Sequence, residues 1–289
     1  MQTIGFIGLG LMGEAMSKNI VQKHEGKVFV YDLNKEQVAK LVDAGATAAD
    51  SIAEVAKKAD VIISMVPKSV HVQAVYKELI PELSERHITI DMSTIDPSVS
   101  IEVSKQVAET GAIMLDAPVV KSVPAAIAAD LGIYIGGDKA AYEKVEHILA
   151  MMGSNQIHLG DNGRGLVMKI LHNNLVGGIQ NAMNEMVAAA EHYGIEKDDF
   201  GTACSYGGAS NFYMTGKLPA VAKQDYTTAF SLENMAKDVH IMKSMMEESG
   251  LTLPGVDVVK AVYDQGLEAG IGGEDFCATY KVVQQNSKA

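Results

Sequence analysis

The chain has 289 residues, of which 47% are hydrophobic and 21% are charged, the composition of a globular protein with one large or two ordinary domains. Its formal net charge of −12 argues against nucleic acid or an anionic membrane as a partner. Two distant cysteines, Cys204 and Cys277, define neither a disulfide framework nor a zinc site. The start of the sequence has no signal-peptide pattern, and no apolar run approaches the ~20 residues of a membrane helix. We expect a cytoplasmic protein.

The first part of the chain alternates short apolar runs with amphipathic ones, which is typical of β-α-β units around a parallel sheet. After residues 160–163 the strand-like runs stop and helical patterns broken by glycines follow. We predict a doubly wound, Rossmann-type α/β domain at 1–161, a long helix between the domains, and an all-helical domain at 162–289. The predicted strands are 3–7, 27–31, 61–65, 88–91, 113–115, 132–135 and 157–159, and the predicted helices are 12–22, 35–44, 70–83, 98–110, 140–151, 163–193, 197–205, 232–249, 256–269 and a short last one.

A glycine motif lies between the first predicted strand and the first predicted helix. Gly8-Leu9-Gly10-Leu11-Met12-Gly13 has the spacing of a dinucleotide-binding turn, in which backbone N–H groups and the helix N-terminus face a pyrophosphate. Asp32 ends the second strand, where a carboxylate binds both hydroxyls of the adenosine ribose and opposes a phosphate there. We predict NAD rather than NADP as the cofactor.

Two later strand ends are expected at the same crevice, because ligands of open α/β sheets lie beyond the carboxyl ends of the strands. Val66 and Pro67 follow one strand, and Ser93 and Thr94 follow the next. We predict cofactor contacts for Val66, Pro67 and Thr94, and a substrate contact for Ser93. A plain turn or helix cap explains the two hydroxyls equally well at this stage.

The predicted helix 163–193 carries a lysine and several amides on one face. An apolar face lies opposite, and we expect it to pack in the helical domain. Taken alone, the helix favours a solvated surface lysine at Lys169. The polar face holds Lys169, Asn173, Gln180 and Asn184, and the apolar face holds Val167, Leu171, Leu175, Ile179, Met183, Met186, Val187 and Ala190.

Six ordered sequence blocks resemble the β-hydroxyacid dehydrogenase family, which includes 3-hydroxyisobutyrate dehydrogenase, tartronate semialdehyde reductase and sulfolactaldehyde reductase. The resemblance implies a homodimer or homotetramer, Lys169 as acid and base, Asn173 as a substrate-positioning residue, and Lys237 beside the active site. Lys237 and Asp238 are thereby candidate cofactor contacts, and Lys237 also a substrate contact. The blocks are residues 8–16, 91–97, 116–119, the glycines, lysine and asparagine of 163–173, 237–238 and 272–275.

The chemistry supports the lysine independently of the resemblance. Reduction of an aldehyde by hydride transfer leaves an alkoxide that needs a proton, and the reverse reaction needs a base; no metal is required. Asn173 lies one helical turn from Lys169, on the face expected to close the cofactor crevice. We expect a neighbouring cation such as Lys237, or desolvation, to lower the pKa of the Lys169 ammonium.

The sequence departs from the family's usual carboxylate-binding Ser-Gly-Gly, which is replaced by Val120-Lys121-Ser122. A lysine at this position favours an anionic head group bound by Lys121 and Ser122, and sulfolactaldehyde reductases resemble the chain in having a basic residue there. A solvent-facing loop lysine is the alternative for Lys121. His172 also departs from the family pattern, and we assign it no role.

The leading interpretation is an NAD-linked oxidoreductase for a small anionic 3-hydroxy acid, or hydroxy-sulfonate, and its semialdehyde. Sulfolactaldehyde reduction is the narrower hypothesis, with tartronate semialdehyde reductase and 3-hydroxyisobutyrate dehydrogenase as alternatives. Imine reductases share the architecture but usually lack the lysine that matches Lys169. A non-enzymatic dinucleotide-binding regulator is the alternative of another class. The substrate, the physiological direction, and the choice of dimer or tetramer stay open.

Overall fold

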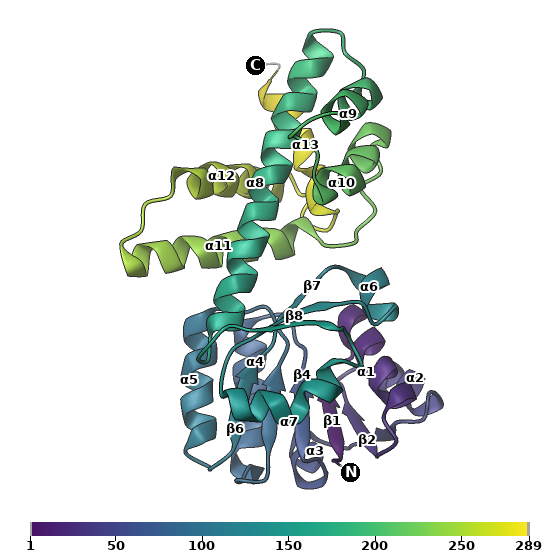
Figure 1. The fold of residues 1–289 in the computed structure, drawn as a ribbon, viewed down its shortest axis with the longest axis vertical. Helices are drawn as coiled ribbons and strands as arrows, with labels where there is room; N and C mark the ends of the chain where they lie inside the picture. Colours follow the sequence, from purple (N-terminus) through teal and green to yellow (C-terminus); the bar gives the residue numbers. More distant parts are fainter. Residues whose placement is uncertain (1, 288–289) are drawn as a thin grey trace. The chain divides into compact units, whose positions relative to one another are not determined.

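The computed structural model describes residues 2–287 and divides into two compact units, Met1–Lys169 and Ile170–Ala289. The division falls inside α8 (Arg164–His192), the long helix that runs from teal to green in Figure 1. It lies a few residues beyond the predicted boundary because the first turns of α8 belong to the first unit, where Leu166 is buried in a hydrophobic core.

The first unit is built on a six-stranded parallel sheet in the order β3-β2-β1-β4-β5-β6, which is the order of a dinucleotide-binding fold. The last residues of β1, β4, β5 and β6 are in register, so Ile7, Ser64, Asp91 and Asp116 form one row at the carboxyl edge of the sheet. Polar groups that follow this row therefore converge. The strands are β1 (Ile4–Ile7), β2 (Val28–Tyr31), β3 (Thr47–Ala48), β4 (Val61–Ser64), β5 (Ile88–Asp91) and β6 (Ile113–Asp116).

Helices cover both faces of this sheet, which explains why its central strands are apolar without alternation. One hydrophobic core joins the sheet to α1 (Leu11–Lys23), α2 (Lys35–Asp43) and α7 (Lys139–Leu149). A second core on the other face joins it to α3 (Ile52–Lys58), α4 (Ser69–Leu79), extended by a 3₁₀ turn at Ile80–Glu82, and α5 (Pro97–Ala108). The predicted fold class is confirmed.

We expected the last two predicted strands to join the parallel sheet, but they do not. β8 (Gly132–Ile135) and β9 (Asn155–His158) form a separate three-stranded sheet with β7 (Val119–Val120), which pairs antiparallel to β8. The two sheets meet where Asp116 and Gly136 exchange backbone hydrogen bonds of 3.1 and 2.8 Å. The short α6 (Val123–Ile127) connects β7 to β8.

The second unit contains only helices among its described elements. α11 (Leu232–Ser249) and α12 (Pro254–Glu268) pack through a core that includes Val239 and Tyr263. α9 (Lys197–Ser205) was predicted at its observed bounds, whereas α10 (Phe212–Lys223) was not predicted. A 3₁₀ turn at Phe276–Ala278 and α13 (Thr279–Asn286) end the described chain. No helix in residues 2–287 is both long and apolar enough to cross a membrane.

The predicted burial of the apolar face of α8 was right in part: Met183, Val187 and Ala190 are buried as expected, but much of the polar face is buried as well. Its amides are buried because partners distant in sequence satisfy them, and a buried polar group needs such partners. The Tyr213 hydroxyl donates to Gln180 Oε1 at 2.6 Å, and Asn184 Nδ2 donates to Thr279 Oγ1 at 3.0 Å. Three apolar side chains expected inside are instead exposed: Leu171 by 44%, Leu175 by 67% and Met186 by 53%.

Candidate active site

The glycine motif forms a tight turn between β1 and α1, and its three glycines have different reasons to be glycine. Gly8 has a φ of 93°, and a Cβ there would lie 2.3 Å from Met65 O. A Cβ on Gly13 would lie 2.0 Å from Gly8 O, so the start of α1 can approach β1 only without a side chain. A Cβ on Gly10, by contrast, would meet no atom within 4 Å. Gly10 therefore leaves open space at the N-terminus of α1, which suits a pyrophosphate.

Asp32 follows β2 and faces this turn. Its Oδ2 accepts a hydrogen bond from the Leu9 N–H at 2.6 Å, and its Oδ1 accepts one from the Asn34 N–H at 2.7 Å. A carboxylate has about four acceptor positions, so both oxygens retain capacity for ribose hydroxyls. The turn and this carboxylate together fit the adenosine end of a dinucleotide.

The strand-end loops that follow β4 and β5 are tied to each other by Ser93. The Ser93 hydroxyl is fully buried, accepts from the Val66 N–H at 2.9 Å and donates to Asp91 Oδ1 at 2.7 Å. We had predicted a substrate contact for Ser93. Its buried hydrogen bonds suit a residue that holds the two loops together better than one that touches substrate. Thr94 is half-buried and Pro67 is exposed, so both stay candidates for cofactor contact.

The first turn of α8 is anchored by Asp116, a residue to which sequence analysis assigned no role. Its Oδ1 accepts from the Gly163 N–H at 2.6 Å and its Oδ2 from the Leu166 N–H at 2.9 Å. Burial raises the pKa of the Asp116 carboxyl, and the bonds from Gly163 and Leu166 partly offset that effect. A Cβ on Gly165 would lie 2.4 Å from Tyr134 O. Two features of the sequence could have indicated this close contact: the glycines at 163 and 165, and the Asp-Ala-Pro-Val block at 116–119.

Lys169 lies on α8, little more than a turn after this anchor, and its side chain is only 8% exposed. A lysine this buried is unusual and contradicts the simple interpretation of a solvated surface lysine. Residues four apart on a helix share a face, so Asn173 follows Lys169 by one turn on the same side. Asn173 is likewise buried, with 5% of its surface exposed.

Asn173 is held by a carboxylate from α11. Its Nδ2 donates to Asp238 Oδ2 at 2.6 Å, and Lys237 Nζ lies 2.8 Å from Asp238 Oδ1. Because a carboxylate only accepts, this bond turns the Asn173 amide so that its Oδ1 faces away and can accept from a hydroxyl. Asp238 is fully buried. That position suits a carboxylate that orients Asn173 and Lys237 better than the direct cofactor contact we had predicted.

Lys121 follows β7 and has a φ of 78°, a conformation that favours glycine. Its Nζ forms an ion pair with Asp130 Oδ2 at 2.5 Å, and both side chains are partly exposed, by 38% and 57%. Ser122 precedes α6 without capping it through its side chain. The sequence did not predict the partner of Lys121, and a substrate anion would have to compete with the Asp130 carboxylate.

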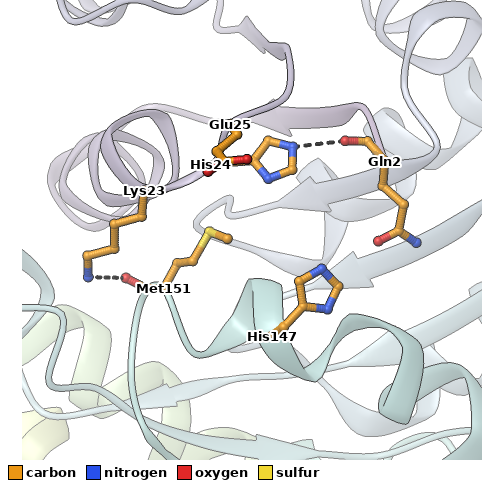
Figure 2. A pocket seen from close by; sticks show the side chains of 6 residues that line it. All are labelled: Gln2, Lys23, His24, Glu25, His147 and Met151. Carbon is orange, nitrogen blue, oxygen red and sulfur yellow. Dashed lines mark hydrogen bonds between the residues drawn. The ribbon is translucent and has the colours of Figure 1, made fainter.

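A hollow of about 500 Å³ lies elsewhere in the first unit (Figure 2). It is lined by Gln2 before β1 and by Lys23 and His24 at the end of α1, whereas the glycine turn joins the other ends of these elements. Two of its polar groups are already bonded: Lys23 Nζ donates to Met151 O at 2.7 Å, and His24 Nε2 lies 2.8 Å from Gln2 O. This hollow is distinct from the dinucleotide-binding turn.

Comparison with known families matches both halves of the chain. Residues 3–160 match the NAD-binding domain of 6-phosphogluconate dehydrogenase. Residues 163–283 match a domain described as NAD-binding of NADP-dependent 3-hydroxyisobutyrate dehydrogenase. The two matches meet at the start of α8.

Similar proteins cover nearly the whole chain. The mitochondrial 3-hydroxyisobutyrate dehydrogenase of Drosophila melanogaster is 31% identical over 98% of this chain and 90% of its own length. NAD-dependent L-serine dehydrogenase of Pseudomonas aeruginosa is 31% identical over 98% of each chain. The structure of Mycobacterium tuberculosis 3-hydroxyisobutyrate dehydrogenase with L-serine superposes with a TM-score of 0.92, at 27% identity, over 98% of this chain and 99% of that one.

These matches agree with a dinucleotide-binding turn in the first unit, and they exclude the non-enzymatic regulator as an interpretation. An imine reductase from Myxococcus stipitatus is less similar, with a TM-score of 0.66 at 21% identity over 97% of this chain and 99% of that one, and shows the fold alone. The chain belongs to the β-hydroxyacid dehydrogenase family and is an NAD-dependent dehydrogenase that acts on a hydroxyl group.

Proposed function

We propose that the enzyme interconverts a small anionic 3-hydroxy acid and its semialdehyde, with Lys169 as the acid and base. The observation that carries this proposal is the burial of the Lys169 side chain, which is 8% exposed on a helix whose first turn is fixed by Asp116. A merely solubilising lysine has no reason to be buried, whereas a proton donor must be held in place.

The roles of the residues follow from the two half-reactions. NAD(H), when bound, supplies or accepts the hydride at the substrate carbon. In reduction, the Lys169 ammonium donates a proton to the oxygen that becomes the hydroxyl; in oxidation, the neutral amine removes it. Asn173, turned by Asp238, offers its Oδ1 as an acceptor and thereby orients the substrate.

The glycine turn and Asp32 are proposed to hold the cofactor. Val66, Pro67 and Thr94 are the proposed contacts from the neighbouring loops. Lys237, which is paired with Asp238 on α11, is a proposed contact for substrate or cofactor. Each of these assignments rests on the position of the residue within its own unit.

The head group of the substrate is proposed to be an anion near Lys121 and Ser122. A sulfonate, as in a sulfolactaldehyde reductase, is the narrower hypothesis, and Lys121 is its main support. The ion pair with Asp130 weakens this support, because it offsets the charge of Lys121 before any substrate arrives. An exposed ion pair contributes only about 0–1 kcal/mol, so an anionic substrate can displace it.

Carboxylate substrates are a second candidate. Relatives of this chain are named 3-hydroxyisobutyrate dehydrogenase and L-serine dehydrogenase, and one 29% identical over 97% of this chain and 98% of its own length is named glyoxylate/succinic semialdehyde reductase 1 of Arabidopsis thaliana. 3-Hydroxyisobutyrate dehydrogenase and tartronate semialdehyde reductase activities fit the same site residues.

The experiment that tests the proposal is NADH oxidation with a panel of semialdehydes of matched length whose head groups are carboxylate, sulfonate and phosphate. We expect activity with at least one anionic head and none with neutral aldehydes. Lys121→Ala should lower kcat/KM for the preferred head, while Lys139→Ala, which removes an exposed lysine on α7, should not. Unchanged head-group preference in Lys121→Ala would remove Lys121 from the site.

We also propose that the enzyme is a cytoplasmic homo-oligomer that associates through α8. Leu171, Leu175, Ala182 and Met186 are exposed in the single chain and recur at four- and seven-residue spacing, within one face of the helix. Apolar stripes of this kind mark association surfaces. The α8 stripe, as we call these four residues, suits a symmetric contact with a second copy, either in a dimer or within a tetramer.

A further inference from the structure

A buried polar cluster lies under the carboxyl ends of β4 and β5. Asp91, the last residue of β5, is fully buried, and its Oδ1 accepts from Ser64 Oγ at 2.8 Å and from Ser93 Oγ at 2.7 Å. Ser64 is the last residue of β4. Asp91 thus joins two neighbouring strand ends through side chains.

The hydrogen bonds of Ser93 have a fixed direction. Its hydroxyl carries one proton, and a carboxylate can only accept, so Ser93 donates to Asp91 and its oxygen is left to accept from the Val66 N–H at 2.9 Å. The result is a relay from the Val66 main chain through Ser93 to Asp91. A hydrogen bond that ends on a charged group is stronger than one between neutral groups.

The segment held by this relay adjoins the glycine turn. Met65 N donates to Ile7 O at 2.9 Å, and Met65 O is the atom that a Cβ on Gly8 would approach to 2.3 Å. A displacement of Val66 would therefore move the main chain against which Gly8 is packed. The glycine turn depends on the position of this loop.

We propose that Asp91 is a positioning residue for the dinucleotide, which acts through Ser93 to hold the Val66 main chain against the glycine turn. Asp91 itself touches no ligand, because it is fully buried beneath the loop. This inference rests on cofactor binding at the glycine turn, and it adds a residue that fixes the geometry of that site.

The charge of Asp91 is maintained against its surroundings. Burial raises the pKa of the Asp91 carboxyl to about 6, the bonds from Ser93 and Ser64 oppose that effect, and the charge of Asp116 on β6 adds to it. Tyr76 on α4 is a further polar neighbour of Asp91 and itself lies beside Thr89 on β5, and Asp91 Oδ2 has no hydrogen-bond partner within residues 2–287. Protonation below pH 6 converts the relay's final acceptor to a neutral, weaker one, so the loop should be held less firmly in acid.

Hydrogen exchange on the protein without cofactor tests the relay directly, followed at the Val66 amide by NMR. Ser93→Ala removes the acceptor of this amide, and we expect its exchange to accelerate at least tenfold. Ser64→Ala is the matched control, because it removes the other hydroxyl from the same Asp91 oxygen and leaves the relay intact. Equal effects of the two variants on Val66 exchange would overturn the proposal.

Cofactor binding tests the consequence, with NADH affinity measured by nicotinamide fluorescence at pH 8 and pH 5.5. We expect Ser93→Ala to weaken NADH about 3- to 10-fold at pH 8, the worth of one hydrogen bond, and the wild type to bind more weakly at pH 5.5. Asp91→Asn keeps an acceptor for Ser93 but cannot ionise, so it should lose most of that pH difference. A pH difference that persists in Asp91→Asn would refute the role of Asp91. If the wild type binds no NADH at either pH, the proposed function fails, while the exchange experiment still reports on the relay.

Discussion

The buried Asp116 carboxylate offers a test of how α8 is anchored. Asp116→Asn keeps the shape of the side chain but replaces one accepting oxygen by an NH₂ group, so either the Gly163 or the Leu166 N–H loses its acceptor. A buried N–H without an acceptor costs about 1–3 kcal/mol. The lost attraction between the carboxylate and the helix N-terminus adds up to ~2 kcal/mol. Removal of the charge offsets part of the total, because burial disfavours the ionised carboxylate and raises the pKa of Asp116. We expect a net loss of about 1–3 kcal/mol in the free energy of unfolding.

The assay is urea unfolding followed by far-UV circular dichroism, because the chain has no tryptophan. Asp138→Asn at the N-terminus of α7 is the control: this cap is exposed, accepts from the Ala141 N–H, and keeps that acceptor as an amide, so its effect should stay within about 0.5 kcal/mol. Since Lys169 follows the anchor on the same helix, kcat of Asp116→Asn should also fall, by roughly 100-fold for a shift near 1 Å. Equal stability and equal kcat in the two variants would refute this account of Asp116.

Three further predictions concern the cofactor, the buried charge and assembly. Asp32→Ser should lower kcat/KM for NADH by about 10- to 100-fold and reduce the preference for NADH over NADPH. A wild-type enzyme that uses NADPH as well as NADH would contradict the role of Asp32. Because burial raises the pKa of Asp91 from 3.8 to about 6 in the folded state, ionisation of Asp91 should lower the free energy of unfolding by up to about 3 kcal/mol as pH rises from 4 to 8. Urea unfolding at both pH values should show a smaller decrease in this free energy for Asp91→Asn than for the wild type. Leu175→Glu should shift light-scattering mass toward the monomer, whereas Ile127→Glu, at a side chain that is 66% exposed against 67% for Leu175, should not; an unchanged mass in both would contradict the α8 stripe.

Local signals were sufficient for the dinucleotide-binding half of the site. The glycine motif, its preceding strand and Asp32 obey rules that span about 25 residues, and the structure has the predicted turn. The parallel sheet contains five of the predicted strands and one more, β3, that was not predicted. The strands at β8 and β9 were recognised by composition, but which sheet they join depends on the backbone pairing of Asp116 with Gly136, which no local pattern specifies.

The burial of α8 could not be predicted for a similar reason. A helical wheel separates the polar face from the apolar face, but which face is buried depends on partners far along the chain. Asn173 is satisfied by Asp238, 65 residues later, and Asn184 by Thr279, 95 residues later. The wheel therefore placed Lys169 with the right neighbours and gave no reason to expect that it is buried.

Lys121 illustrates the limit of a resemblance. The alignment located the departure from Ser-Gly-Gly, and the φ of 78° at Lys121 shows why a glycine suits this position. The ion pair with Asp130 depends on how the chain returns after α6. The alignment indicated that the substrate head group should bind near Lys121, but it did not reveal that Asp130 offsets the charge of this lysine.

The central claim is that Lys169 transfers the proton, and a single-turnover experiment with Lys169→Ala tests it most directly. Enzyme with bound NADH is mixed with the preferred semialdehyde, and loss of NADH absorbance is followed beside Arg164→Ala, which changes an exposed residue on the same helix. We predict that Lys169→Ala binds NADH normally but transfers hydride about 10²- to 10⁴-fold more slowly, while Arg164→Ala reacts within a few-fold of the wild type. Hydride transfer in Lys169→Ala within tenfold of the wild type, with NADH binding intact, would contradict the claim.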